Sequence, residues 1–169
     1  MRATLWTVGT KGGGKVSIVP RPSGGDSLPD EMKALRKHGV DLLISAQPPL
    51  EGGFYGLSGE GAAAEAAGMA FLNIPIADMA VPPDRADFLA ALSGPIARVR
   101  EGGHVAVHCF ASRGRSGVIA GLLLAAGGFE PEDGLQRMSK VRGYRVPETE
   151  EQRAWMLETA AMLNEADAG

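Results

Sequence analysis

Short apolar runs alternate with amphipathic stretches along most of the 169-residue chain. Runs rich in Val, Ile and Leu predict strands at 4–8, 15–19, 40–45, 69–76 and 105–107. Apolar residues at helical spacing, with acidic residues early and basic residues or glycine late, predict helices at 30–38, 60–67, 84–100, 118–126, 132–141 and 150–165. Segments rich in Gly or Pro predict loops at 20–27, 51–59, 77–83 and 143–147.

The order of these elements, β-β-α-β-α-β-α-β-α-α-α, predicts an α/β fold with a central, mostly parallel sheet flanked by helices. Residues 1–169 are expected to form one domain, with an N-terminal hairpin at about 4–20 and a core at about 28–165. Gly94-Pro95 predicts a kink or a break in the helix at 84–100.

The turn of the hairpin contains a sequence with the GxxxxGK spacing of a nucleotide-binding P-loop, Gly9 to Lys15. The next residue is Val16, where Mg²⁺ coordination requires Ser or Thr, and a strand pattern follows instead of a helix. A hairpin turn is therefore favoured over a nucleotide site.

Composition and charge exclude several classes of protein. A net charge of −3 and a hydrophobic content of 44% are typical of a globular protein that does not bind nucleic acid. No window approaches 18 consecutive apolar residues, so no membrane span is expected, and the first residues do not resemble a signal peptide. The single cysteine excludes an internal disulfide and fits a reducing compartment. A cytoplasmic monomer is the expectation.

The most informative segment chemically is HCFASRGRSG, residues 108–117, between a predicted strand and a predicted helix. A strand, a tight turn and a helix N-terminus form an anion site, because several backbone N–H groups there have no intrahelical partner. Cys109 and Arg115 lie in this turn, and thiols beside guanidinium groups at helix N-termini ionise readily. The segment therefore combines a nucleophile with an oxyanion site.

The Cys109-x5-Arg115 spacing lets the intervening N–H groups and the guanidinium surround a tetrahedral oxyanion. Cys109 would attack phosphorus as a thiolate, Ser116 would hydrogen-bond that thiolate, and His108 would order the loop. The alternative, a buried structural cysteine, is less favoured because this combination of residues is specific. The predicted phosphate-binding residues are Phe110, Ala111, Ser112, Arg113, Gly114 and Arg115.

Residues 108–117 resemble the HCxxGxxRS/T signature of the cysteine-dependent protein tyrosine phosphatases, especially their small dual-specificity branch. The resemblance extends over about residues 28–163. It implies the protein tyrosine phosphatase-like (phosphotyrosine phosphatase II) fold and hydrolysis through a phosphocysteine intermediate, with no metal and no cofactor. It also implies an aspartic acid on a separate loop that protonates the leaving oxygen.

Residues 73–82 resemble the acid loop of that family, which makes Asp78 the expected general acid. Asp84 and Asp87 are weaker candidates, because a helix start explains acidic residues there. Near the C-terminus, Gln152 follows a helix-opening threonine, Thr149, as in a segment of the family. Gln152 either orients the hydrolytic water or is solvated beside a capping threonine.

Two residues depart from the family pattern. Ser112 occupies a position where the family usually has glycine, so the local backbone geometry is open. Arg113 adds a positive charge at the rim of the loop. That charge either favours substrates with extra negative charge or only raises the local potential.

The expected activity is hydrolysis of phosphomonoesters, with phosphotyrosine or dual-specificity protein substrates; the expected partner is a phosphorylated protein or a small phosphoester. The first alternative is a phosphatase for phosphoinositides or other non-protein phosphates. A rhodanese-type sulfurtransferase also uses a cysteine in an anion-binding loop, but it requires neither the Arg115-Ser116 pair nor a remote acid. An inactive phosphate-binding module is disfavoured by the complete set Cys109, Arg115 and Asp78.

Overall fold

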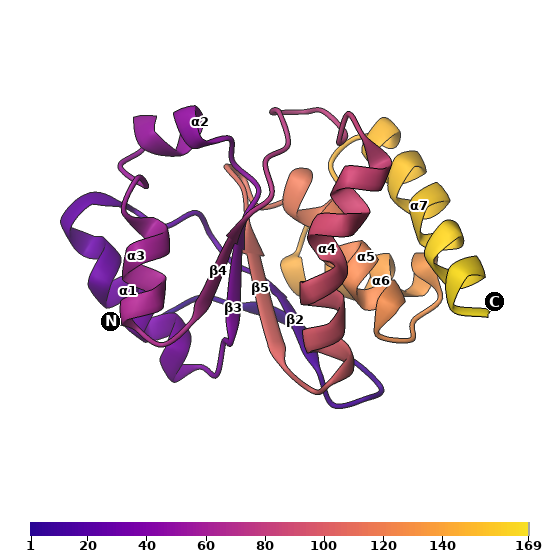
Figure 1. Ribbon diagram of the computed structural model, residues 1–169, viewed down its shortest axis with the longest axis horizontal. Coiled ribbons are helices and arrows are strands. Elements are labelled where there is room, and N and C mark those ends of the chain that lie inside the picture. Colours follow the sequence, from indigo (N-terminus) through magenta and orange to yellow (C-terminus); the bar gives the residue numbers. More distant parts are fainter. Residues whose placement is uncertain (169) are drawn as a thin grey trace.

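The computed structural model describes residues 1–168 and shows a five-stranded sheet with helices on both faces (Figure 1). The strand order is β1-β2-β5-β3-β4, and only the β1–β2 pair is antiparallel. The predicted α/β fold with a mostly parallel sheet is thus confirmed. The strands are β1 (Trp6–Gly9), β2 (Lys15–Ile18), β3 (Leu42–Ser45), β4 (Ala70–Asn73) and β5 (His104–His108).

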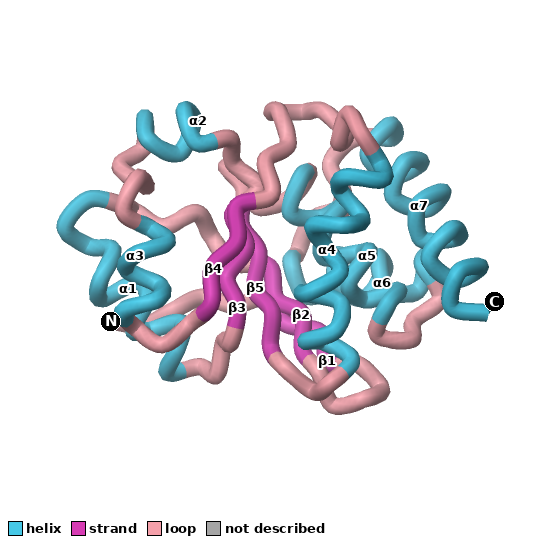
Figure 2. The backbone as a smooth tube through the Cα atoms, in the orientation of Figure 1, coloured by secondary structure: helices cyan, strands magenta, loops and turns pink. Residues whose placement is uncertain are grey.

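The helices form two layers (Figures 1 and 2). α1 and α3 pack together on one side of the sheet, whereas α4, α5, α6 and α7 cover the other side. A 3₁₀ turn at Gly25–Ser27 precedes the first helix. The helices are α1 (Leu28–Lys37), α2 (Pro49–Phe54), α3 (Glu60–Ala66), α4 (Arg85–Arg100), α5 (Arg115–Ala126), α6 (Pro131–Arg142) and α7 (Glu150–Ala168).

β5 is the middle strand, and all five of its residues are buried. Successive side chains of a strand point to opposite faces, so a strand covered on both sides is apolar on both. Val105 and Val107 belong to the core under α4 and α5, whereas Ala106 belongs to the core under α1. The carboxyl end of β5 is therefore held from both layers, and the segment 108–117 begins there.

Two local predictions require correction. The predicted loop at 51–59 begins inside a short helix, α2, which Pro49 starts because proline suits the first helical turn. The helix at 84–100 is not split at Gly94-Pro95; α4 runs through Pro95. Pro95 is buried with Leu92 and Ile96, and we attribute the continuity to this packing, which offsets the hydrogen bond that proline removes.

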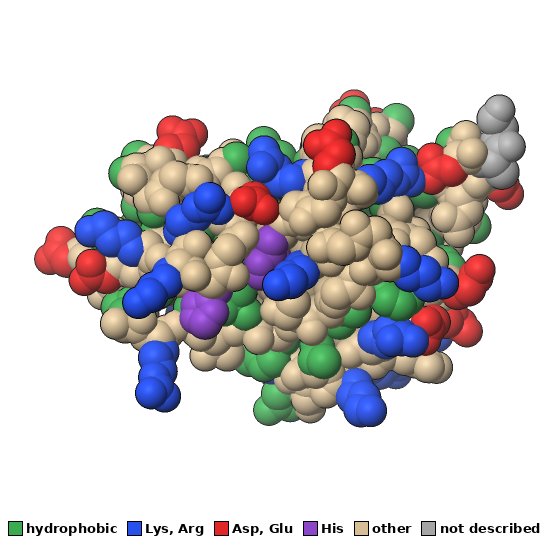
Figure 3. All heavy atoms as spheres, turned by 90° about the horizontal axis from the view of Figure 1, so that it is seen from below, with side chains coloured by type: hydrophobic (Ala, Val, Ile, Leu, Met, Phe, Trp, Pro, Cys, Tyr) green, Lys and Arg blue, Asp and Glu red, His purple; other side chains and the backbone are tan. Residues whose placement is uncertain are grey.

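The loops that follow β3, β4 and β5 all lie at one end of the sheet, with α2 beside them (Figure 2). The opposite end, shown in Figure 3, carries basic and acidic side chains that are interspersed rather than gathered by sign. Within residues 1–168, no helix combines the length and the apolar character that crossing a membrane requires.

Candidate active site

The segment 108–117 forms the turn between β5 and α5, as predicted. Cys109 is 2% exposed, and its Sγ atom lies 3.3 Å from Oγ of Ser116 in the first turn of α5. The backbone N–H groups of residues 110–116 donate no hydrogen bond to another described residue. Unpaired N–H groups around a helix N-terminus are a site for an anion, so the thiol lies within an anion-binding loop.

Arg142, the last residue of α6, holds this loop from outside. Its guanidinium donates hydrogen bonds to the carbonyl oxygens of Ala111 (3.1 Å) and Ser112 (2.9 Å). In a trans peptide unit the N–H points opposite to the C=O, so the N–H groups of Ser112 and Arg113 point away from Arg142. Burial, followed by the positive charge of Arg113, lowers the pKa of Arg142 below its usual value.

Ser112 adopts a left-handed backbone conformation, with φ of 55°. This is the position at which the family usually has glycine, and glycine has no steric penalty there. The Ser112 hydroxyl donates a 2.6 Å hydrogen bond to the carbonyl of Val19, which follows β2. This hydrogen bond to a buried acceptor offsets the backbone cost of a serine and anchors the loop to β2.

Arg115 is buried, and its guanidinium is held by three groups. Nη1 donates to the Glu51 carboxylate at 3.1 and 3.2 Å and to the carbonyl of Ile76 at 3.0 Å. Nη2 lies 3.3 Å from Oδ1 of Asp78 but forms no hydrogen bond. One edge of the guanidinium is thus fixed by protein, while Nη2 retains capacity for an oxyanion.

Asp78 lies in the loop between β4 and α4, which passes over the carboxyl end of the sheet (Figure 2). Its side chain is 67% exposed. Asp84 instead caps α4 by accepting a hydrogen bond from the N–H of Asp87 at 3.0 Å, which agrees with its interpretation as a helix-start residue.

These groups border one cavity of about 160 Å³. Cys109 and Arg115 come from the β5–α5 turn, and Asp78 comes from the loop before α4. The tertiary structure therefore brings together the three residues expected to carry the chemistry. The lining residues are Asp78, Met79, Cys109, Phe110, Ala111, Gly114, Arg115, Glu148 and Gln152.

Comparison with protein-family models and with curated proteins gives no match. Solved structures do match. Kinase associated phosphatase, with its catalytic cysteine replaced by serine, has a TM-score of 0.82 at 16% identity over 97% of both chains. Tk-PTP in its active form has a TM-score of 0.66 at 25% identity over 89% of this chain and 91% of its own. This chain has a protein tyrosine phosphatase-like fold.

A third protein of this fold, PTPMT1 in complex with PI(5)P, has a TM-score of 0.73 at 19% identity. The match covers 97% of this chain and 99% of PTPMT1. The resemblance predicted from residues 108–117 is therefore confirmed at the level of the fold.

In this phosphatase-like fold, Gln152 is buried rather than solvated, which corrects one of the two interpretations of its sequence context. Its Oε1 accepts from the N–H of Thr149, while its own N–H donates to the Thr149 hydroxyl, which is a capping box at the start of α7. Its Nε2 donates to the carbonyl of Ala80 at 3.2 Å. Gln152 therefore connects α7 to the loop that carries Asp78.

His108, the residue before Cys109, is fully buried. Its Nδ1 lies 3.3 Å from the carbonyl oxygen of Cys109, and its Nε2 lies 2.5 Å from Oε1 of Glu60. Glu60, the first residue of α3, is also buried. The pair connects α3 to the backbone of the cysteine.

Four residues of this site were not predicted: Glu51, Glu60, Arg142 and Glu148. Each lies in a loop or at the end of a helix, where a charged side chain is usually exposed to solvent. Only contacts between segments far apart in the chain identify them, and one sequence contains no signal of such contacts. Among residues 1–168, no group of three His, Cys, Asp or Glu side chains has the arrangement of a metal site.

Proposed function

We propose that this protein is a cysteine-dependent phosphatase that hydrolyses phosphomonoesters, with phosphotyrosine or dual-specificity protein substrates. One observation carries the proposal: a buried thiol at Cys109 lies in a loop whose N–H groups are unpaired, beside a guanidinium with a free donor. The phosphatases that share its fold support the same chemistry. Residues 28–165 are the proposed catalytic core.

In the first step, the thiolate of Cys109 attacks phosphorus, and an S–P bond forms as the bond to the leaving oxygen breaks. Asp78 gives its proton to that oxygen. The N–H groups of residues 110–115 and the guanidinium of Arg115 stabilise charge on the equatorial oxygens. Glu51 and Ile76 restrict the rotation of Arg115, so little reorganisation accompanies the reaction.

In the second step, water attacks phosphorus and gives a proton to Asp78, and the S–P bond breaks. Ser116, whose hydroxyl lies 3.3 Å from the sulfur, stabilises the departing thiolate by a hydrogen bond. Gln152 lines the cavity and holds the loop of Asp78, so its proposed role is to position that loop and the attacking water.

The alternative substrate class, a phosphoinositide or another non-protein phosphate, has specific support. Arg113 adds a second positive charge to the turn that contains Arg115, and PTPMT1 has this fold in complex with PI(5)P. The rhodanese-type reaction and the inactive binding module have no comparable support, because neither uses Asp78.

We also propose a monomeric protein of the cytoplasm. A catalytic thiolate requires a compartment that keeps it reduced. Light scattering of the purified protein tests whether it is a monomer, since a mass well above 17.6 kDa would contradict that proposal.

The decisive experiment measures hydrolysis of p-nitrophenyl phosphate by the wild-type protein and by Cys109→Ser. We expect turnover in the wild type and none above background in the variant, because serine is a much weaker nucleophile at neutral pH. Thermal unfolding of both proteins controls for folding. Residual turnover in Cys109→Ser would contradict the mechanism, and thiosulfate–cyanide transfer by the wild type would instead identify a sulfurtransferase.

A further inference from the structure

Arg21 lies in the loop after β2, and its guanidinium packs on two aromatic rings. The guanidinium carbon is 4.2 Å from the ring centre of Tyr55 and 4.6 Å from that of Phe110. The two rings lie 5.2 Å apart. Three segments distant in sequence therefore meet at this point, namely the β2–α1 loop, the end of α2 and the catalytic turn.

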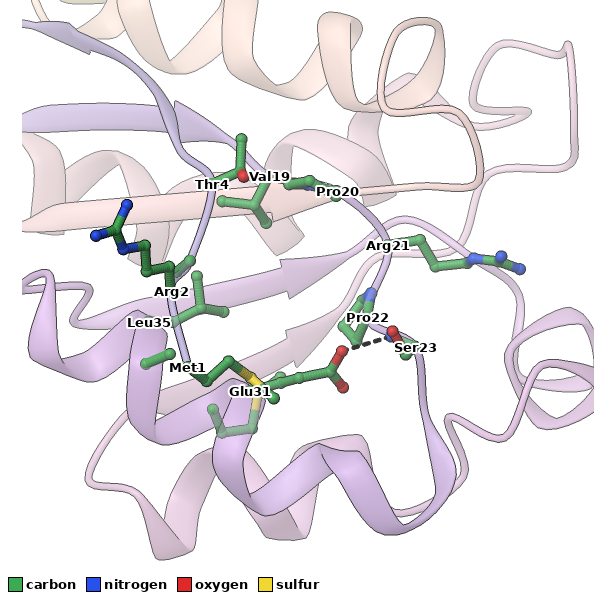
Figure 4. Close-up of a pocket in the computed structure, with 13 residues that line it drawn as sticks. Met1, Arg2, Thr4, Val19, Pro20, Arg21, Pro22, Ser23, Glu31 and Leu35 are labelled. Carbon is green, nitrogen blue, oxygen red and sulfur yellow. Dashed lines mark hydrogen bonds between the residues drawn. The ribbon is translucent and has the colours of Figure 1, made fainter.

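No carboxylate neutralises Arg21. Among residues 1–168, Arg21 forms no ion pair, and its buried Nη1 atom has no hydrogen-bond acceptor. The nearby carboxylate of Glu31 is occupied, because it accepts from the N–H groups of Ser23 (2.7 Å) and Gly24 (3.4 Å). In Figure 4 the Arg21 side chain extends away from Glu31. By contrast, several other arginines contact a carboxylate: Arg36, Arg85, Arg100, Arg137, Arg145 and Arg153.

The stacking does not use the N–H donors of the Arg21 guanidinium. A guanidinium interacts with aromatic rings through its flat face, whereas its N–H donors point outward in its plane. These donors match two oxygens of a phosphate or a carboxylate. The rings of Tyr55 and Phe110 thus hold the guanidinium in one orientation, so its donors bind an anion with little further loss of side-chain entropy.

The site is contiguous with the catalytic cavity. Phe110 lines that cavity and also contacts Arg21. An anion bound at Arg21 would therefore lie beside the cavity that is proposed to hold the scissile phosphate. Arg113, in the same turn as Phe110, also has a buried nitrogen, Nε, with no acceptor. Two guanidinium groups without carboxylates favour a dianionic phosphate over a carboxylate.

We propose that Arg21, oriented by Tyr55 and Phe110, binds a second phosphate group of the substrate beside the catalytic cavity. The substrate class is then a phosphomonoester that carries a further phosphate close to the one that is cleaved. This inference rests on the proposed phosphatase function for its turnover measurements, but not for its binding measurements.

The test compares an inositol monophosphate with an inositol bisphosphate whose phosphates are on neighbouring carbons. We expect the wild type to prefer the bisphosphate in kcat/KM, and Arg21→Gln to reduce kcat/KM for it by about 10- to 100-fold, as charge-assisted hydrogen bonds imply. Turnover of the monophosphate should remain within about twofold. Equal losses on both substrates, or no loss on either, would overturn the proposal.

Three variants sharpen this comparison. Tyr55→Leu removes one ring but keeps the charge of Arg21. It should lose much of the preference for the bisphosphate, because the guanidinium is then less firmly oriented. Arg21→Lys keeps the charge without the planar donors, so it should retain only part of the wild-type preference for the bisphosphate. Arg137→Gln is the matched control, since Arg137 also stacks on a phenylalanine but pairs with Asp133. An equal loss in Arg137→Gln would show an effect of net charge and overturn the site.

Binding to Cys109→Ser separates this proposal from the catalytic one. Calorimetry should show tighter binding of the bisphosphate than of the monophosphate, and Arg21→Gln in the same background should abolish the difference even if the protein has no turnover. A diacyl lipid with the same headgroup, in phosphatidylcholine vesicles, tests whether the source is a membrane lipid. A preference confined to phosphotyrosine peptides with acidic neighbours would overturn the assignment to a second phosphate.

Discussion

The contacts of Asp78 and Glu148 decide which of the two carboxylates can act as the proton donor. Both line the cavity that contains Cys109. Asp78 additionally lies 3.3 Å from Nη2 of Arg115, the donor proposed to bind phosphate, whereas Glu148 contacts none of the residues in the catalytic turn by ion pair. A proton donor must lie within reach of the leaving oxygen, so we propose Asp78 rather than Glu148 as the general acid.

The Asp78→Asn variant should therefore lose about 100- to 10,000-fold in kcat on substrates with poor leaving groups, since a general acid contributes on that order. The loss should be smaller for p-nitrophenyl phosphate, whose leaving group requires less protonation. Glu148→Gln is the matched control, and kcat against leaving-group acidity is the measurement. A leaving-group dependence that changes in Glu148→Gln and not in Asp78→Asn would reverse the assignment.

His104, at the opposite end of β5, links stability to pH. Burial lowers the pKa of His104 below the ordinary value of 6.5, and the positive charges of Lys15 and His38 lower it further, while Asp41 opposes them. The unfolded chain then binds the proton more tightly than the folded one. The stability contribution of neutral His104 is complete above about pH 6.5 and is lost as the pH falls below it.

Urea unfolding at about pH 7.5 and about pH 5.5 tests this linkage. The free energy of unfolding should fall at the lower pH, and His104→Gln should reduce the size of that fall. His38→Gln should reduce the fall to a smaller extent, because the positive charge of His38 is one of the weaker causes of the lowered pKa of His104. A pH dependence that is identical in wild type and His104→Gln would assign it to other groups.

At the scale of elements, α6 holds the turn at residues 108–117 from outside. Arg142 hydrogen-bonds two carbonyls of the turn and stacks on the Trp6 ring of β1, with its guanidinium carbon 3.9 Å from the ring centre. β1 and α6 lie outside the phosphate site, yet together they fix the direction of its peptide units.

Arg142→Gln should reduce kcat at least about tenfold and weaken vanadate binding, because each lost charge-assisted hydrogen bond costs about 1.5–3 kcal/mol. Backbone amide chemical shifts of residues 110–116, with and without vanadate, distinguish a misoriented turn from general destabilisation. Arg137→Gln in the same helix is the control, since Arg137 pairs with Asp133 at the surface. Unchanged vanadate affinity in Arg142→Gln would limit Arg142 to a packing role.

At the scale of the whole molecule, the site is an assembly of both helical layers. Arg115 comes from α5 on one side of the sheet, and the carboxylate that holds it, Glu51, comes from α2 near the other layer. Gln47 donates to the same carboxylate at 2.7 Å and so fixes its position. Arg115, the arginine proposed to bind phosphate, is thus oriented by contacts between elements that are far apart in the chain.

Glu51→Gln should raise KM and lower kcat/KM by about 10- to 100-fold, because a charged partner of a buried guanidinium is replaced by a neutral one. The melting temperature should fall as well, because the buried guanidinium of Arg115 loses its charged partner, so kcat/KM is measured well below that temperature. Glu31→Gln, another carboxylate that holds a loop, is the control for loss of a negative charge. Activity that is equal in both variants and the wild type would contradict the positioning role of Glu51.

The sequence by itself determined the strands, most of the helices and the turn at residues 108–117. These features depend on residues close together in the chain: apolar periodicity, caps, and the fixed spacing of Cys109, Arg115 and Ser116. The conformation of Ser112 and the helix at Pro49–Phe54 were not determined in this way.

Only the tertiary structure decided which side chains complete the site. Glu51, Glu60 and Arg142 are 64, 48 and 30 positions from the residues that they hold, so their roles depend on the packing of whole elements. The same applies to Arg21, whose partners Tyr55 and Phe110 belong to two other segments. Residues adjacent in the sequence determine the strands, the helices and the turn at 108–117. Which charged side chains contact that turn depends on how the elements pack in three dimensions.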